Sequence, residues 1–207
     1  MDRPVVGIDL AGSPRRDTGF CAMDMKLRCS TSVLHTDEEI LAATLEVSPR
    51  VVSIDAPLFL PKGRMRIEDR GPPHFRECDK ELLKMKIRFF PISLGPMRML
   101  TSRGMALRAA LEEKGTEVIE SFPGAIQDLL GMPRKQAGLE SLAKALEEYG
   151  VSMAKGKDPP NGDELDAATS ALVGVLYLKG SYRAIGDPEE GLMILPSQAQ
   201  PSGARRR

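Results

Sequence analysis

Four aspartates lie at the ends of predicted strands and at the start of a predicted helix, where carboxylates from distant segments can meet. Asp9 lies at the end of the apolar segment 5–10, and Asp55 closes a second one at residues 51–54. Asp163 and Asp166 are three residues apart at the start of a helix predicted over 163–179, so both face the same side. Because adjacent strand ends converge at one crevice of an open sheet, we expect all four side chains to share one site.

Such a cluster indicates a metal centre. Carboxylates held together repel one another unless a cation neutralises them. Hard oxygen ligands suit Mg²⁺ or Mn²⁺ rather than zinc. Two such ions, roughly 3.5–4 Å apart, can activate a water and stabilise the leaving oxygen in a displacement at phosphorus. The prediction rests on the set, because any one aspartate could instead cap a turn or a helix.

Glu120 is the candidate for a further catalytic carboxylate. It closes a third apolar strand, predicted over residues 116–120. Two roles are open to it: an additional metal ligand, or a salt bridge that orients Arg103.

The segments between these acids predict an α/β fold in a single domain. Three strands are expected at 5–10, 19–25 and 27–34, the last two as a hairpin, and a further strand or packed tail at 185–196. Helices are expected at 38–46, capped by Thr36 or Asp37, and at 75–86, 97–114 and 137–149. Residues 59–73 and 151–162 are predicted to be loops. The domain is predicted to span 1–198, with an inserted loop and helices at about 59–114 and a disordered tail at 199–207.

The charges are balanced over the chain but not along it. There are 29 basic and 29 acidic residues, which counts against coating nucleic acid by bulk charge. Residues 62–108 nevertheless hold twelve Lys or Arg against five Asp or Glu. This basic segment is either a solvated surface or an arm that grips phosphates, and Arg76 and Arg103 are the preferred substrate residues. His74 lies within it and is a candidate for proton transfer.

The amino-acid composition indicates which kind of nucleic acid the protein binds and in which cellular compartment it is found. Aromatic residues make up 4% and Trp is absent, which disfavours a platform for stacking single-stranded bases, so duplex or branched nucleic acid is the preferred partner. Three cysteines without a C-x-x-C spacing predict reduced, buried thiols. With no signal peptide or membrane segment, we expect a cytoplasmic protein without membrane contact. A homodimer is left open.

The final-helix segment, Asp163 to Ala168 (DELDAA), resembles the motif of Holliday-junction resolvases, in which small residues follow two aspartates three apart. Nearly the whole chain resembles a bacterial and archaeal family described as predicted RNase H-like nucleases. The matching pieces are GIDLAGS at Gly7, SIDAPL at Ser53, Arg76 with Asp79, Arg103-Gly104, Glu120-Ser121-Phe122-Pro123-Gly124 and GDPEEGLMILP.

This resemblance implies an RNase H-like mixed central sheet, with strands 1–3 antiparallel and later strands parallel, flanked by helices. It also implies metal-ligand roles for the four residues Asp9, Asp55, Asp163 and Asp166. The ribonuclease H enzymes proper take a further glutamate from the first helix. Several glutamates lie in that helix here, and nothing in the sequence selects one.

The leading hypothesis is thus a nuclease that uses Mg²⁺ or Mn²⁺ to hydrolyse a nucleic-acid phosphodiester. An ATP-binding phosphotransferase of the sugar-kinase and actin class is the first alternative. Its first strand also carries G-x-D before a loop of small residues, where Gly12 and Ser13 could touch phosphate, although that class needs a duplicated domain. The second alternative is a non-catalytic scaffold that keeps the fold; metal titration discriminates, because a metal site gains stability on binding.

Overall fold

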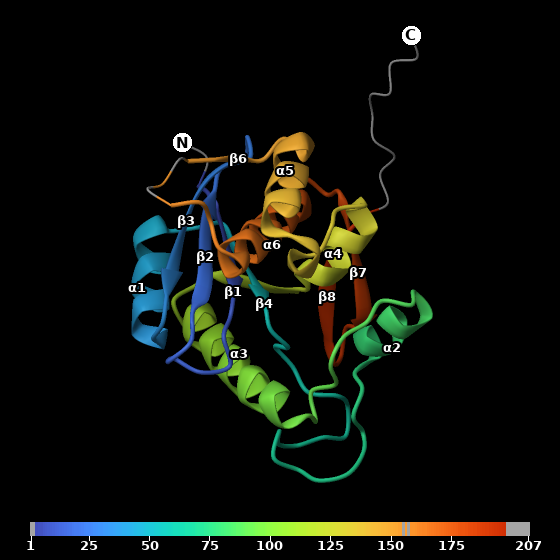
Figure 1. The fold of residues 1–207 in the computed structure, drawn as a ribbon. Helices are drawn as coiled ribbons and strands as arrows, with labels where there is room; N and C mark the ends of the chain where they lie inside the picture. Colours follow the sequence, from blue (N-terminus) through green and yellow to red (C-terminus); the bar gives the residue numbers. More distant parts are fainter. Residues whose placement is uncertain (1–2, 155, 157, 198–207) are drawn as a thin grey trace.

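The computed structural model describes residues 3–154, 156 and 158–197, and one eight-stranded sheet forms its centre (Figure 1). The strand order is β6-β3-β2-β1-β4-β5-β8-β7. The strands are β1 Val5–Asp9, β2 Thr18–Met23, β3 Arg28–Leu34, β4 Val51–Asp55, β5 Glu117–Ser121, β6 Ser152–Met153, β7 Tyr182–Asp187 and β8 Gly191–Pro196.

The strand directions confirm the expected mixed sheet. β1, β2 and β3 are antiparallel neighbours, and β4, β5 and β8 continue from β1 in parallel. Two details differ from expectation. The short strand β6 pairs with β3 inside a segment predicted to be a loop. The C-terminal segment is a hairpin rather than one strand, because a turn at 188–190 reverses the chain, with the Glu190 N–H donating to the Asp187 carbonyl.

The helices follow the predicted order with one addition. The addition is the helix α4 with the short 3-10 helix η1 after it. Pro123 stands in the first turn of α4, and Gly131 ends it in the left-handed conformation, both of which are ordinary helix boundary signals. The helices are α1 Asp37–Val47, α2 Glu77–Lys84, α3 Gly95–Glu113, α4 Pro123–Leu130, η1 Lys135–Ala137, α5 Leu139–Tyr149 and α6 Gly162–Leu178.

Helix α6 packs against β1 and β2 at backbone contact distance. A Cβ atom added at Gly7 would lie 2.1 Å from the Ala167 carbonyl oxygen, and one added at Gly19 would lie 1.9 Å from that of Asp163. Only glycine permits this approach. These two glycines therefore place the first turn of α6 directly beside the end of β1.

The alternation of strand residues decides which side chains face α6. Gly7 faces α6, and since successive residues point to opposite faces, Asp9 faces the same side. Asp55 pairs with Asp9 across β1 and β4, so it also faces α6. The intervening Ile8 and Ile54 point to the opposite face and are fully buried there.

The inserted segment hangs below the sheet, between β4 and α3 (Figure 1). Residues 59–73 form the loop expected, and the buried Arg64 organises it. The Arg64 guanidinium donates to the carbonyls of Pro73, Asp69 and Gly71 at 2.6–3.1 Å. Helix α2 then packs on β7 at the sheet edge.

Two expectations concern segments that are described only in part. The predicted tail at 199–207 lies outside the described residues, as do residues 155 and 157 of the predicted loop 151–162. Within the described part of the chain, no helix combines the length and apolarity that crossing a bilayer requires.

Candidate active site

The structure brings the four aspartates together. Asp9 and Asp55 end adjacent parallel strands at the same register. Asp163 and Asp166 lie in the first turns of α6, which the glycines of β1 and β2 hold against those strand ends. We call Asp9, Asp55, Asp163 and Asp166 the aspartate cluster.

Asp163 is not the cap of its helix. The N-cap of α6 is Asn161, whose side chain accepts the backbone N–H groups of Asp163 and Glu164 at 3.0 and 2.9 Å. Glu164 completes a capping box by accepting from the Asn161 N–H, and it also accepts from the Thr31 hydroxyl. The capping alternative considered for Asp163 therefore belongs to Asn161, and the Asp163 carboxylate remains available to the cluster.

A lysine ammonium stands among the carboxylates. The Nζ atom of Lys135 lies 3.2 Å from Asp9 Oδ2, 2.9 Å from Asp163 Oδ1 and 2.9 Å from Asp166 Oδ2. Lys135 comes from η1, and its side chain is 29% exposed. Carboxylates from β1 and from the start of α6 thus share one cationic atom, which η1 supplies.

This single positive charge does not balance four carboxylates. Burial raises the pKa of Asp9 to about 7; Lys135 opposes the shift, while Asp166 and Asp163 reinforce it. Burial, and then the charges of Asp9 and Asp166, raise the pKa of Asp55 well above its usual range. Burial lowers the pKa of Lys135, but the surrounding carboxylates outweigh it and hold the pKa above its ordinary value. The site therefore favours additional positive charge.

Gln127 of α4 orders one member of the cluster. Its amide Nε2 donates to Asp166 Oδ1 at 2.7 Å and lies 3.3 Å from the Thr169 hydroxyl. One oxygen of Asp166 is thus oriented by an amide and the other by Lys135. The missed helix α4 and η1 supply both side chains.

Glu120 lines the same cavity as Asp55, and its charge adds to the raised pKa of Asp55, but it is not one of the carboxylates around Lys135. Glu120 lies opposite Ile54 in the register, whereas Ser121 lies opposite Asp55, so alternation turns Glu120 to the other face of the sheet. There its Oε2 accepts from Arg76 Nη1 at 2.8 Å and from the Leu58 N–H at 2.7 Å. Burial raises the pKa of Glu120, and the charge of Arg76 opposes that shift. The partner is Arg76 rather than the Arg103 that the sequence suggested.

The two arginines predicted to bind substrate are engaged within the protein. Arg76 is buried and also contacts the Asp79 carboxylate through Nε and Nη2, at 3.2 and 2.9 Å. Arg103 donates to Asp37 Oδ1 and to the carbonyls of Ala11 and His35, at 2.6–2.7 Å. In this arrangement Arg76 joins the insertion to β5, and Arg103 holds the loop after β1 against α1.

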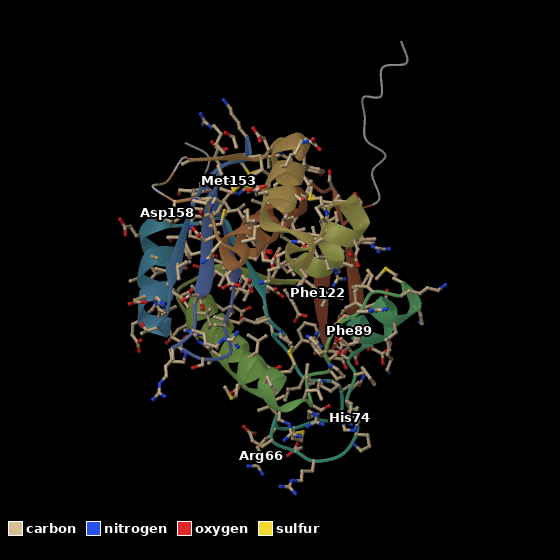
Figure 2. The ribbon with its side chains drawn as sticks, in the orientation of Figure 1. Arg66, His74, Phe89, Phe122, Met153 and Asp158 are labelled. Atoms are coloured by element: carbon tan, nitrogen blue, oxygen red, sulfur yellow. The ribbon has the colours of Figure 1, made fainter. Side chains whose placement is uncertain are left out.

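Ser13 lies in that loop and accepts the Arg15 N–H through its hydroxyl at 3.3 Å. Figure 2 shows His74 near the lower end of the molecule, away from Phe122. The cysteines Cys21, Cys29 and Cys78 are free and buried, as expected.

A cavity of about 780 Å³ adjoins the cluster. Asp55, Asp166 and Lys135 belong to its lining. Three phenylalanines form another part of the lining, which we call the phenylalanine wall: Phe89, Phe90 and Phe122. The other basic residues of its lining are Arg76, Lys86, Arg88 and Arg134. Three of these, Arg76, Lys86 and Arg88, belong to the basic segment that the sequence singled out.

The chemistry of the cluster fits a divalent cation, but its present geometry is closed by Lys135. The donors are carboxylate oxygens, the ligands preferred by Mg²⁺ and Mn²⁺, and the pKa values of Asp9 and Asp55 are raised first by burial and then by the charges of neighbouring carboxylates. Within the described residues, however, no three His, Cys, Asp or Glu side chains are arranged as a metal-binding group. Lys135 has to move for these oxygens to close around a metal.

Comparisons with known proteins agree with this architecture. A family model described as "Protein of unknown function (DUF429)" matches residues 7–191. A search of curated proteins finds no match. The chain is similar in structure to T. thermophilus RuvC in complex with a Holliday junction substrate, with a TM-score of 0.52, 14% identity, and coverage of 86% of this chain and 96% of that chain. A second Thermus thermophilus RuvC structure gives a TM-score of 0.50 with the same identity and coverage. At this identity the similarity shows the fold, which is RNase H-like.

Proposed function

Since the chain belongs to the family described as protein of unknown function (DUF429), we propose a function from its own site: a divalent-metal-dependent nuclease that hydrolyses a nucleic-acid phosphodiester. The observation that supports this most is the convergence of Asp9, Asp163 and Asp166 on a single cationic atom. The RNase H-like fold, with RuvC as a structural neighbour that is bound to a Holliday junction, agrees with it.

The aspartate cluster would hold Mg²⁺ or Mn²⁺. When bound, such an ion activates a water for attack at phosphorus and neutralises charge on the departing oxygen. The chain's own contribution is to fix the ligands: the strand register fixes Asp9 and Asp55, and the Asn161 cap fixes the first turn of α6. Gln127 orients Asp166.

Lys135 has two parts in this proposal. Without metal, its ammonium offsets part of the repulsion among the carboxylates. Once displaced, its long side chain stays beside the cavity that it lines, where a lysine ammonium suits a phosphate oxygen. Lys135 thus serves first as a counter-ion and then as a phosphate contact.

A cleavage assay tests the proposal. The full chain is incubated with duplex DNA, an RNA–DNA hybrid and a four-way junction, in Mn²⁺, in Mg²⁺ or in EDTA. We expect cleavage of at least one substrate with either metal and none in EDTA. Asp9→Asn and Asp166→Asn should each lower the rate by two or more orders of magnitude, because each removes a charged ligand.

The matched control is Glu148→Gln, the same carboxylate-to-amide change at a residue of α5 whose side chain is 68% exposed. It should cleave like the unaltered chain. Cleavage that persists in EDTA, or that Asp9→Asn leaves unchanged, would contradict the proposal, as would intact substrates under every condition.

A further inference from the structure

The cavity beside the aspartate cluster carries an inference about what the protein binds. We propose that it receives one unstacked nucleotide of the nucleic-acid strand, with the base against the phenylalanine wall and a phosphate facing Lys86 and Arg88. This rests on the proposed function for the identity of the strand but has its own readout.

The size of the cavity suits a small group rather than a duplex. Its volume of about 780 Å³ falls in the range of about 300–1,000 Å³ that small-molecule sites occupy. A base that stays paired and stacked cannot enter such a pocket. A base reaches it only from a single-stranded or branched region, or after extrusion from the helix.

The phenylalanine wall offers a stacking surface for the base. The chain has only six Phe and no Trp, and three of the six line this one cavity. Phe90 is 70% exposed, so its ring is open to a partner. Phe89 is braced by an edge-on contact with Phe75 at 6.1 Å between ring centroids. Figure 2 places Phe89 and Phe122 close to each other, below α4 and beside α2.

Two cations near this wall are available to a phosphate. Lys86 and Arg88 are exposed, and the part of the chain that the structure describes gives neither of them an ion-pair partner. Arg134 differs, because Asp128 holds its guanidinium at 2.6 and 2.9 Å, near the Phe122 ring. The pair Lys86 and Arg88 is therefore the phosphate contact that we assign.

The cavity lining carries both signs of charge. Asp55 and Asp166 belong to it, and so do Lys86 and Arg88. An apolar ligand without phosphate would satisfy the rings but leave both cations unpaired. A nucleotide matches rings and cations at once. Without metal, a second phosphate on the side of the aspartates meets the Lys135 ammonium. With metal bound, the strand's next phosphate would lie at the proposed metal site.

Calorimetry with a nucleotide tests this without relying on cleavage. Thymidine 3′,5′-bisphosphate, which carries a base between two phosphates, is titrated into the full chain in EDTA. Deoxyribose 5-phosphate, which lacks the base, is the comparison ligand. We expect saturable binding of the bisphosphate and at least tenfold weaker binding of the sugar phosphate.

Three variants locate the binding. Phe90→Ala should lower the affinity for the bisphosphate by about fivefold to a hundredfold, the range that corresponds to loss of a stacking ring. Arg88→Gln should lower the affinity for the bisphosphate and leave the affinity for the nucleoside thymidine unchanged. Met99→Ala is the matched control, because Met99 is a 56% exposed apolar side chain of the adjacent α3 outside the cavity lining, and it should bind like the unaltered chain. All three positions are exposed, and a thermal melt of each variant verifies folding.

The inference is overturned if the bisphosphate does not bind up to millimolar concentration, or if the sugar phosphate binds equally well. It is also overturned if Phe90→Ala and Arg88→Gln bind the bisphosphate with the same affinity as Met99→Ala. These outcomes are separate from the fate of the nuclease proposal. Metal-dependent cleavage by a chain that does not bind the bisphosphate would leave the nuclease and remove the nucleotide pocket. Binding of the bisphosphate by a chain that cleaves no substrate would leave the nucleotide pocket and remove the nuclease proposal.

Discussion

Replacing Lys135 by methionine tests the counter-ion role quantitatively. The change keeps most of the side-chain length and removes the charge. Loss of one partner from a buried ion pair costs about 3–5 kcal/mol. Because the Lys135 side chain is 29% exposed, solvent screening reduces this, and we expect the metal-free protein to lose about 2 kcal/mol of unfolding free energy.

The same free energy must reappear in metal affinity. In the unaltered chain, a metal has to displace the ammonium from Asp9, Asp163 and Asp166, so the affinity is lowered by whatever Lys135 contributes to the metal-free state. Two kcal/mol corresponds to roughly 30-fold in affinity. Lys135→Met should therefore bind Mn²⁺ roughly 30-fold more tightly.

Urea denaturation in EDTA measures the first quantity and calorimetric Mn²⁺ titration the second. Lys144→Met is the matched control, since Lys144 is a 75% exposed lysine of α5, and neither quantity should change there. Weaker Mn²⁺ binding by Lys135→Met would refute the reasoning, because it would mean that the ammonium supports the metal instead of standing in its place.

Three further predictions follow from the packing and the charges. Gly19→Ala should lower the free energy of unfolding by 2 kcal/mol or more, roughly the upper range of overpacking, because the new methyl would meet the Asp163 carbonyl oxygen at 1.9 Å; a thermal melt no different from that of the unaltered chain would count against the close packing of α6. Arg76→Met should lower stability by about 3–5 kcal/mol, since it strands the two buried carboxylates that Arg76 pairs; a variant of normal stability would instead favour the predicted substrate role. Without metal, the raised pKa of Asp9 means that this carboxyl binds its proton more tightly in the folded chain than in the unfolded chain. Its contribution to the free energy of unfolding is therefore greatest below about pH 4 and declines as the pH rises to about 7. Urea denaturation of Asp9→Asn in EDTA should show a weaker decline over that window, and identical pH profiles would contradict it.

The sequence predicted the aspartate cluster because its signals are local. Asp9 and Asp55 close short apolar strands, and two aspartates three apart begin an apolar helix. The glycines of β1 and β2 that make the contact with α6 possible show their purpose only once the chain is folded.

Lys135 and Gln127 could not be found in the same way. Gln127 lies in α4 and Lys135 follows it, and the sequence analysis predicted no helix there, although Pro123 and Gly131 mark the two ends of α4. Nothing local distinguishes Lys135 from the other 28 basic residues. Its role depends on three long-range contacts.

Glu120 and Arg76 show the opposite problem. Each has a residue type and a position that suit a site, but the strand register turns Glu120 away from Asp55. A register is a property of the assembled sheet, and one residue of shift exchanges the two faces. The low aromatic content likewise argued against a surface on which bases stack, because an average over the chain does not reveal that three phenylalanines line one cavity.

Anomalous diffraction from a crystal soaked in Mn²⁺ tests the shared cation site most directly. The account predicts a manganese peak bounded by carboxylate oxygens of Asp9, Asp55, Asp163 and Asp166, with the Lys135 ammonium withdrawn from its present position. A fully soaked crystal with no peak there, and with Lys135 still bonded to the three aspartates, would contradict it.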